Sequence, residues 1–123
     1  MLTLNEVLSD FKDYSDFDDR CKVDIFSKNS EGKTALHWMA MLGDHNGISL
    51  LIDAGSSIDE VDNEGCAPIH EAVANRQITA VRALVLGGAD LGVRNNLGQT
   101  PKDMAISDGY KPIVDFLNGW IQK

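Results

Sequence analysis

The chain has 123 residues, enough for one domain with a hydrophobic core and too few for two well-packed ones. Hydrophobic residues make up 43% and charged residues 24%, which excludes a wholly disordered chain, and there is no membrane-spanning apolar run and no secretory signal. The net charge of −8 disfavours direct binding to nucleic acid or anionic membranes, and the two cysteines, too few for a disulfide framework, favour the cytoplasm.

The negative charge is concentrated in the first half of the chain. Residues 1–64 contain 14 acidic and 5 basic residues, whereas residues 65–123 contain 5 acidic and 6 basic ones. Any surface that attracts a basic partner is therefore expected in the first half.

The N-terminal segment is predicted to be a capping helix. Thr3 and Glu6 have the spacing of a capping box. Leu4, Val7, Leu8 and Phe11 then follow at the spacing of one helical face. A second short helix is expected around Phe17 and Cys21, with Cys21 in the core.

A 33-residue repeat dominates the rest of the chain. Gly32, Gly65 and Gly98 are each 33 residues apart. The segments that begin at these glycines read Gly-Lys-Thr-Ala-Leu-His, Gly-Cys-Ala-Pro-Ile-His and Gly-Gln-Thr-Pro-Lys-Asp. Gly55 and Gly88 recur at the same interval and are predicted to end helices in a left-handed conformation.

This period and this motif together resemble the ankyrin repeat, over about residues 22–123. The resemblance implies an all-α solenoid of stacked helix-turn-helix units with projecting β-turn or hairpin fingers. We predict inner helices near 34–42, 67–75 and 100–107, and outer helices near 46–54, 78–87 and 111–121. The single domain, 1–123, divides into an N-terminal capping part with a degenerate repeat (1–28), two repeats (29–61 and 62–94) and a C-terminal capping repeat (95–123). On this pattern the chain is expected to be a complete, capped stack.

Neither histidines nor cysteines point to catalysis or metal binding. His37 and His70 hold the same place in successive repeats, roughly 10 Å apart by helix-packing distances, too far to share one zinc ion. The resemblance implies instead that such a histidine bonds the capping threonine and the next finger. Cys66 is expected to be an exposed thiol that either contacts a partner or has no special role. No cofactor, metal or catalytic motif is recognised, so we expect no enzyme.

Four acidic residues lie within six positions on one predicted finger, with no base between them: Asp59, Glu60, Asp62 and Glu64. They form either a solvated turn or a docking patch for a basic partner. A calcium loop is less favoured because its closing glutamate is missing. If the turn is exposed, changing all four to lysine should leave folding nearly intact.

The inner-helix positions that the resemblance leaves open to partners carry Met41 and Leu42, with Trp38 nearby. Trp38 packs between repeats or is exposed, and the first alternative is favoured. The candidate partner-binding residues are Trp38, Met41, Leu42, Asp59, Glu60, Asp62, Glu64, Cys66, Glu71 and Asn75.

These features predict a non-catalytic module, monomeric or in a one-to-one complex, that masks or inhibits a basic protein. An immunity or antitoxin protein that covers a basic toxin is one concrete version. The alternatives are an adaptor that links two partners and, less favoured, an enzyme or metal-dependent protein.

Overall fold

The computed structural model describes all residues except 1, 16, 18–19, 21 and 122–123. Within that part the chain forms seven helices and no strands, which confirms the expected all-α class. The helices are α1 (Leu4–Tyr14), α2 (Ala35–Leu42), α3 (His45–Asp53), α4 (Pro68–Ala74), α5 (Ile78–Leu86), α6 (Pro101–Asp108) and α7 (Lys111–Ile121).

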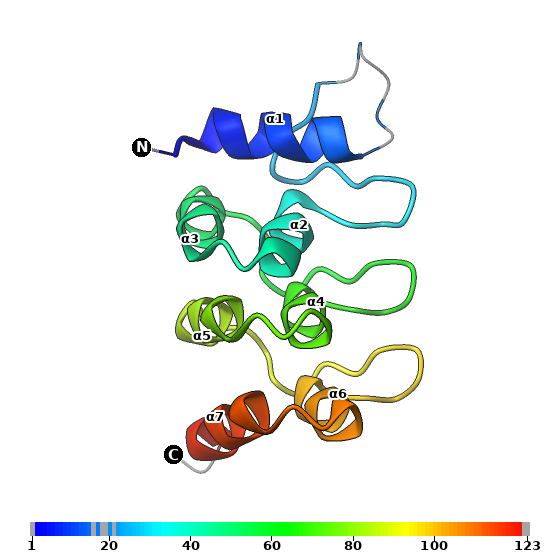
Figure 1. Cartoon of the computed structure of the whole chain (residues 1–123). Coiled ribbons are helices and arrows are strands. Elements are labelled where there is room, and N and C mark those ends of the chain that lie inside the picture. Colours follow the sequence, from blue (N-terminus) through cyan, green and yellow to red (C-terminus); the bar gives the residue numbers. More distant parts are fainter. Residues whose placement is uncertain (1, 16, 18–19, 21, 122–123) are drawn as a thin grey trace.

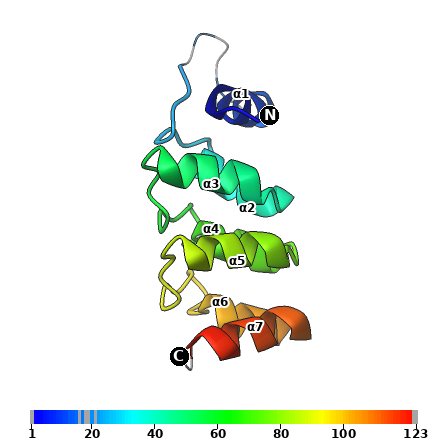
Figure 2. The ribbon, with the colours of Figure 1, turned by 90° about the vertical axis from the view of Figure 1, so that its left-hand side faces the viewer.

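The helices stack as antiparallel pairs in two columns (Figure 1). The inner column contains α2, α4 and α6, the outer column contains α3, α5 and α7, and α1 lies across the first pair. Loops project beyond the inner column as fingers. Figure 2 shows the outer helices side by side. The six repeat helices predicted from the sequence are confirmed to within one residue at each end.

Local sequence signals set these boundaries. Thr3 accepts a hydrogen bond from the Glu6 N–H at 3.2 Å, so it caps α1 as predicted. Proline stands at the first position of α4 and α6, where its missing N–H costs nothing. Gly55 and Gly88, both at φ +98°, follow the outer helices in the left-handed conformation that was predicted. The second short helix expected around Phe17 and Cys21 falls largely on residues outside the described part, although Phe17 itself packs edge-on against Phe11.

One core runs through the stack from end to end. Leu51, Leu84 and Leu117 occupy the same place in successive outer helices and are all fully buried. Val7 and Phe11 of α1 are buried against the first repeat, so the N-terminal helix closes that end of the core. Because each repeat contacts only its neighbours, stability depends on the joints between repeats. None of the described helices has the length and apolar character needed to cross a bilayer.

Each finger turn is built on one side chain with the same function. The side-chain Oδ1 atoms of Asn29, Asp62 and Asn95 each accept two backbone N–H groups, two and four residues further on, at 2.9–3.0 Å. The glycine three residues later has a φ of +76° to +78°, which a side chain would strain. The recurring glycines are therefore turn residues, and Asn or Asp is their partner in the turn.

Candidate protein-binding groove

The candidate site lies where the inner helices face the fingers, and its upper part is apolar. Trp38, Met41 and Leu42 lie one helical turn apart on α2. Leu42 is 48% exposed, whereas Trp38 and Met41 are half-buried. The structure adds Tyr14, at the end of α1, whose ring stacks on Trp38 with centroids 3.8 Å apart and which is 48% exposed. We call these four residues the aromatic patch.

Trp38 therefore packs against the capping helix α1 through the Tyr14 ring. Its Nε1 is buried and meets no hydrogen-bond partner among the described residues. Tyr14 is not among the candidate partner-binding residues predicted from the sequence. Its stacking partner lies 24 residues away, so no local spacing revealed the contact.

The finger with four acidic residues differs from the expectation of a free acidic patch. Asp62 is buried, at 7% exposure, and its Oδ1 serves the finger turn. Glu60 pairs with Lys28 at 2.6 Å, and Asp59 accepts the backbone N–H of Asp90 at 2.9 Å. Glu64 is the one exposed residue among these four acids. The prediction of four solvated acids is therefore wrong at Asp62 and is weakened at Glu60 and Asp59.

Lys33 joins two of the predicted site residues to each other. Its Nζ donates to Asp62 Oδ2 and to Glu71 Oε1, both at 2.6 Å. The three side chains are 12%, 1% and 15% exposed, respectively, so this ion triad is shielded from water. Burial by itself lowers the pKa of Lys33, but the bonds to the two carboxylates outweigh it and leave the pKa well above its usual value. Burial likewise raises the pKa of Asp62, yet the bonds from Lys33 and from the N–H groups of Cys66 and Glu64 hold it below its usual range.

One sequence signal could have identified this triad. Asp62 is the charged member of a series whose other members, Asn29 and Asn95, are neutral. Lys33 is likewise followed in its series by Cys66 and Gln99. A lysine and an aspartate that are each the charged member of their series, and that lie in neighbouring repeats, indicate a pair between those repeats.

Cys66 and Asn75 have mainly structural contacts. Cys66 is half-buried, which corrects the expectation of an exposed thiol. Burial, and then the neighbouring carboxylates Asp62, Glu71 and Glu64, raise its pKa to about 11, so the thiol stays protonated and unreactive near neutral pH. Asn75 is exposed and donates from Nδ2 to the Glu71 carbonyl at the end of α4.

The two buried histidines hold the repeats together, as expected. His37 Nδ1 accepts the Thr34 N–H at 3.1 Å, and its Nε2 lies 2.8 Å from the Cys66 carbonyl of the next finger. His70 makes the corresponding contacts with the Ala67 N–H and the Gln99 carbonyl. Burial lowers the pKa of both rings, which favours their neutral form. Among the described residues no cluster of His, Cys, Asp or Glu is arranged to hold a metal ion.

A family model described as ankyrin repeats, three copies, matches residues 15–95. The chain belongs to the ankyrin-repeat proteins. The fold of an ankyrin-repeat protein is an interaction module, so the expectation of a protein partner is confirmed at that level.

Several curated proteins resemble this ankyrin-repeat protein. The B-cell lymphoma 3 protein homolog of Mus musculus is 34% identical over 93 residues, which are 75% of this chain and 21% of that protein. Protein phosphatase 1 regulatory subunit 27 of Homo sapiens is 31% identical over 98 residues, 80% of this chain and 63% of that protein. A probable palmitoyltransferase of Saccharomyces uvarum is 33% identical over 93 residues, 76% of this chain and 13% of that enzyme. The chain thus spans less than two thirds of each of these relatives.

Proposed function

We propose that this protein is a non-catalytic regulator that binds one protein partner through the aromatic patch and masks part of that partner's surface. The observation that carries the proposal is the pair of side chains Tyr14 and Leu42, each 48% exposed beside the stacked Trp38. Exposed aromatic and aliphatic side chains that sit together on a rigid helix pair are typical of the energetic centre of an interface. Met41 adds an adaptable side chain to the same surface.

A basic partner is favoured by the acidic residues around this surface. Glu31 and Glu64 are exposed on neighbouring fingers, and Asp10 and Asp13 are exposed on α1. Acidic residues at the rim of an interface mainly raise the association rate and exclude acidic competitors. The partner is therefore a protein with an apolar anchor inside a basic surface, and covering a basic toxin in the manner of an immunity protein is a narrower form of the same proposal.

A regulatory role is supported by one relative in particular. The human relative is named as a regulatory subunit of protein phosphatase 1, and this chain covers 63% of its length. A regulatory subunit can act by occupying a surface of its partner, which fits masking in a one-to-one complex in the cytoplasm.

The test is a matched pair of variants on the two faces of the stack. Leu42→Asp places a charge in the aromatic patch, whereas Leu86→Asp changes a more exposed leucine, 67% accessible, on outer helix α5. A partner captured from lysate is identified, purified and titrated against the wild type and both variants by calorimetry. The expected result is one-to-one binding that Leu42→Asp weakens by about a hundredfold and Leu86→Asp leaves unchanged.

The basic character of the partner is tested separately with Glu64→Lys and with added salt. Both should slow association by about tenfold, while dissociation changes little. If Leu86→Asp lost binding while Leu42→Asp kept it, the groove would be rejected as the binding site. Salt-independent binding of an acidic partner would reject the masking of a basic surface.

A further inference from the structure

A cleft lies on the outer face of the stack, between α3 and α5. It has a volume of about 490 Å³. Its floor is formed by Ile52, Ala83 and Gly87, and polar side chains at its rim include His45, Ser49 and Arg82. We call it the outer cleft. Figure 2 shows α3 and α5 side by side on this face, which is turned away from the fingers.

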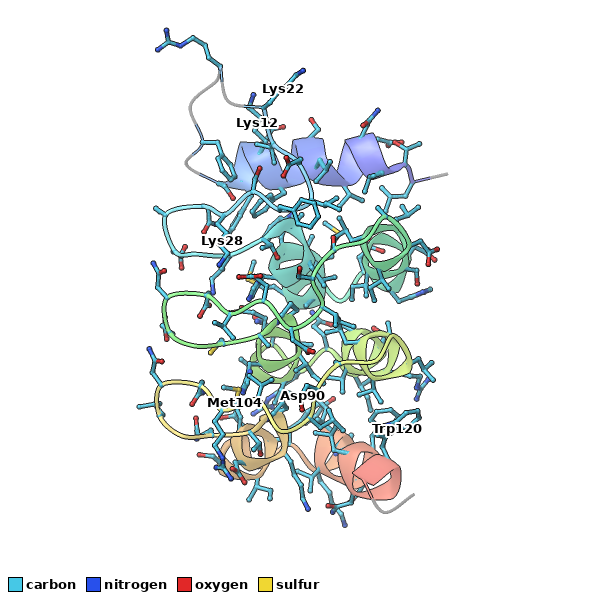
Figure 3. The ribbon with its side chains drawn as sticks, turned by 180° about the vertical axis from the view of Figure 1, so that it is seen from behind. Lys12, Lys22, Lys28, Asp90, Met104 and Trp120 are labelled. Carbon is cyan, nitrogen blue, oxygen red and sulfur yellow. The ribbon has the colours of Figure 1, made fainter. Side chains whose placement is uncertain are left out.

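The corresponding space one repeat further along is filled by the protein itself. Phe116 and Trp120 of α7 stand 33 residues after Ala83 and Gly87 of α5. Their rings stack with centroids 6.4 Å apart, and the Arg82 guanidinium lies 5.7 Å from the centroid of the Phe116 ring. Figure 3 shows Trp120 on the outer-helix side, between α5 and α7. The two equivalent helix pairs thus differ at two positions, because aromatic rings stand in α7 where Ala83 and Gly87 stand at the outer cleft.

Gly87 lies close to α3 at the outer cleft. Its φ of −78° is one that any residue can adopt, so the backbone does not demand glycine there. A Cβ at this position would meet Ile52 Cδ1 at 2.7 Å. A side chain at position 87 would therefore displace the flexible end of Ile52, whereas glycine leaves that end in place beside the cleft.

We propose that the outer cleft binds an aromatic side chain of a second protein partner, on the face opposite the aromatic patch. The occupant is inferred from the molecule's own packing, since the same helix geometry between α5 and α7 is completed by Phe and Trp rings. Arg82 lines the outer cleft and already stacks on one such ring, and aromatic faces attract guanidinium groups. Occupation of both faces makes the protein a bridge between two partners, which goes beyond the masking of one.

The experiment follows backbone amide signals of the isotope-labelled chain by heteronuclear NMR during titration with N-acetyl-L-tryptophanamide. N-acetyl-L-leucinamide is the aliphatic comparison. Saturable shifts are expected at Ser49, Ala83 and Gly87 with the tryptophan probe, with binding about tenfold weaker for the leucine probe. Absence of saturable shifts, equal binding of both probes, or shifts confined to the aromatic patch would overturn the proposal.

Two variants close the outer cleft from opposite sides. Ala83→Phe reproduces in α5 the residue that α7 has at Phe116, and Ser49→Trp fills the cleft from the exposed face of α3. Each should abolish the tryptophan-probe shifts while Leu42→Asp leaves them intact. If Ala83→Phe does not fold, Ser49→Trp alone decides. Retention of the shifts in a folded cleft variant would contradict the assignment, whatever the outcome for the aromatic patch.

Discussion

Two joints connect the three helix pairs of the stack. They share one core and the same backbone arrangement, but different side chains stabilise them, on opposite sides of the stack. The upper joint, between α2/α3 and α4/α5, is locked beside the fingers by Lys33, Asp62 and Glu71, and its outer side is open. The lower joint, between α4/α5 and α6/α7, has a neutral finger turn at Asn95 and is closed on the outer side by aromatic rings. In this protein, therefore, the repeat fixes the packing, while a few side chains decide which surfaces stay available.

The largest effects should come from the core that both joints share. Leu51→Ala and Leu84→Ala each remove a fully buried side chain, so each should lower the free energy of unfolding by roughly 2–5 kcal/mol. Denaturant unfolding followed by circular dichroism measures this. If the losses in the free energy of unfolding for Leu51→Ala and Leu84→Ala differed by more than the width of that range, the two joints would not share one core.

Substitutions in the finger turns should affect the two joints to different extents. Asp62→Ala removes the acceptor of two N–H groups and one partner of Lys33, whereas Asn95→Ala removes the acceptor and a neutral 3.3 Å bond from its Nδ2 to Gln99 Oε1. We expect losses of about 3 kcal/mol and about 1.5 kcal/mol, respectively, in the free energy of unfolding.

Asp62→Asn is the control for this comparison, because it keeps the turn acceptor and loses the charge. The loss in the free energy of unfolding caused by Asp62→Asn should lie between the losses for Asp62→Ala and Asn95→Ala. In a chain that already carries Lys33→Gln, adding Asp62→Asn should cause no further loss. An Asp62→Asn variant as damaging as Asp62→Ala would place the stabilisation in the charge alone. Because Asp62 is buried, we no longer expect folding to stay intact when all four acidic residues of this finger are changed to lysine.

The lower joint should respond to loss of its aromatic filling. Phe116→Ala should reduce the free energy of unfolding by about 2 kcal/mol, because the ring is half-buried and carries contacts with Trp120 and Arg82. Added salt should change this cost little, and it should also leave the cost of Asp62→Asn nearly unchanged, because the ion triad is shielded from water. A salt-sensitive Phe116→Ala cost would indicate that charge also holds the lower joint.

Acidification should weaken both joints through His37 and His70. Their folded pKa values lie below the unfolded value, so the stabilisation is complete above an unfolded pKa of about 6.5 and is lost as the pH falls towards the folded pKa. As the pH falls from about 7 through 6.5, the free energy of unfolding should therefore decrease, with a contribution from each histidine. Further acidification should protonate Asp62 and weaken the upper joint alone, a step that Asp62→Asn removes.

Much of the fold was predictable because the signals that carry it are local and recur. Threonine and proline at helix starts, glycine after outer helices and the leucine spacing act within a few residues, so six helix ranges followed from them. The contacts that form the candidate site connect distant residues. Lys33 meets Asp62 and Glu71 across 29 and 38 positions, and no helical or turn spacing indicates which of many acids a lysine selects.

The amino-acid sequence alone determined the stack, because its 33-residue period and its motif together resemble the ankyrin repeat. It also determined the capping helix, through the capping box at Thr3 and Glu6 and the apolar spacing that follows. Tertiary structure decided which charges reach solvent, how Trp38 packs, and that a cleft remains between α3 and α5. Those properties depend on what faces each side chain from the neighbouring repeat. The sequence shows which side chains each repeat carries, but only the folded stack shows which of them meet across a joint.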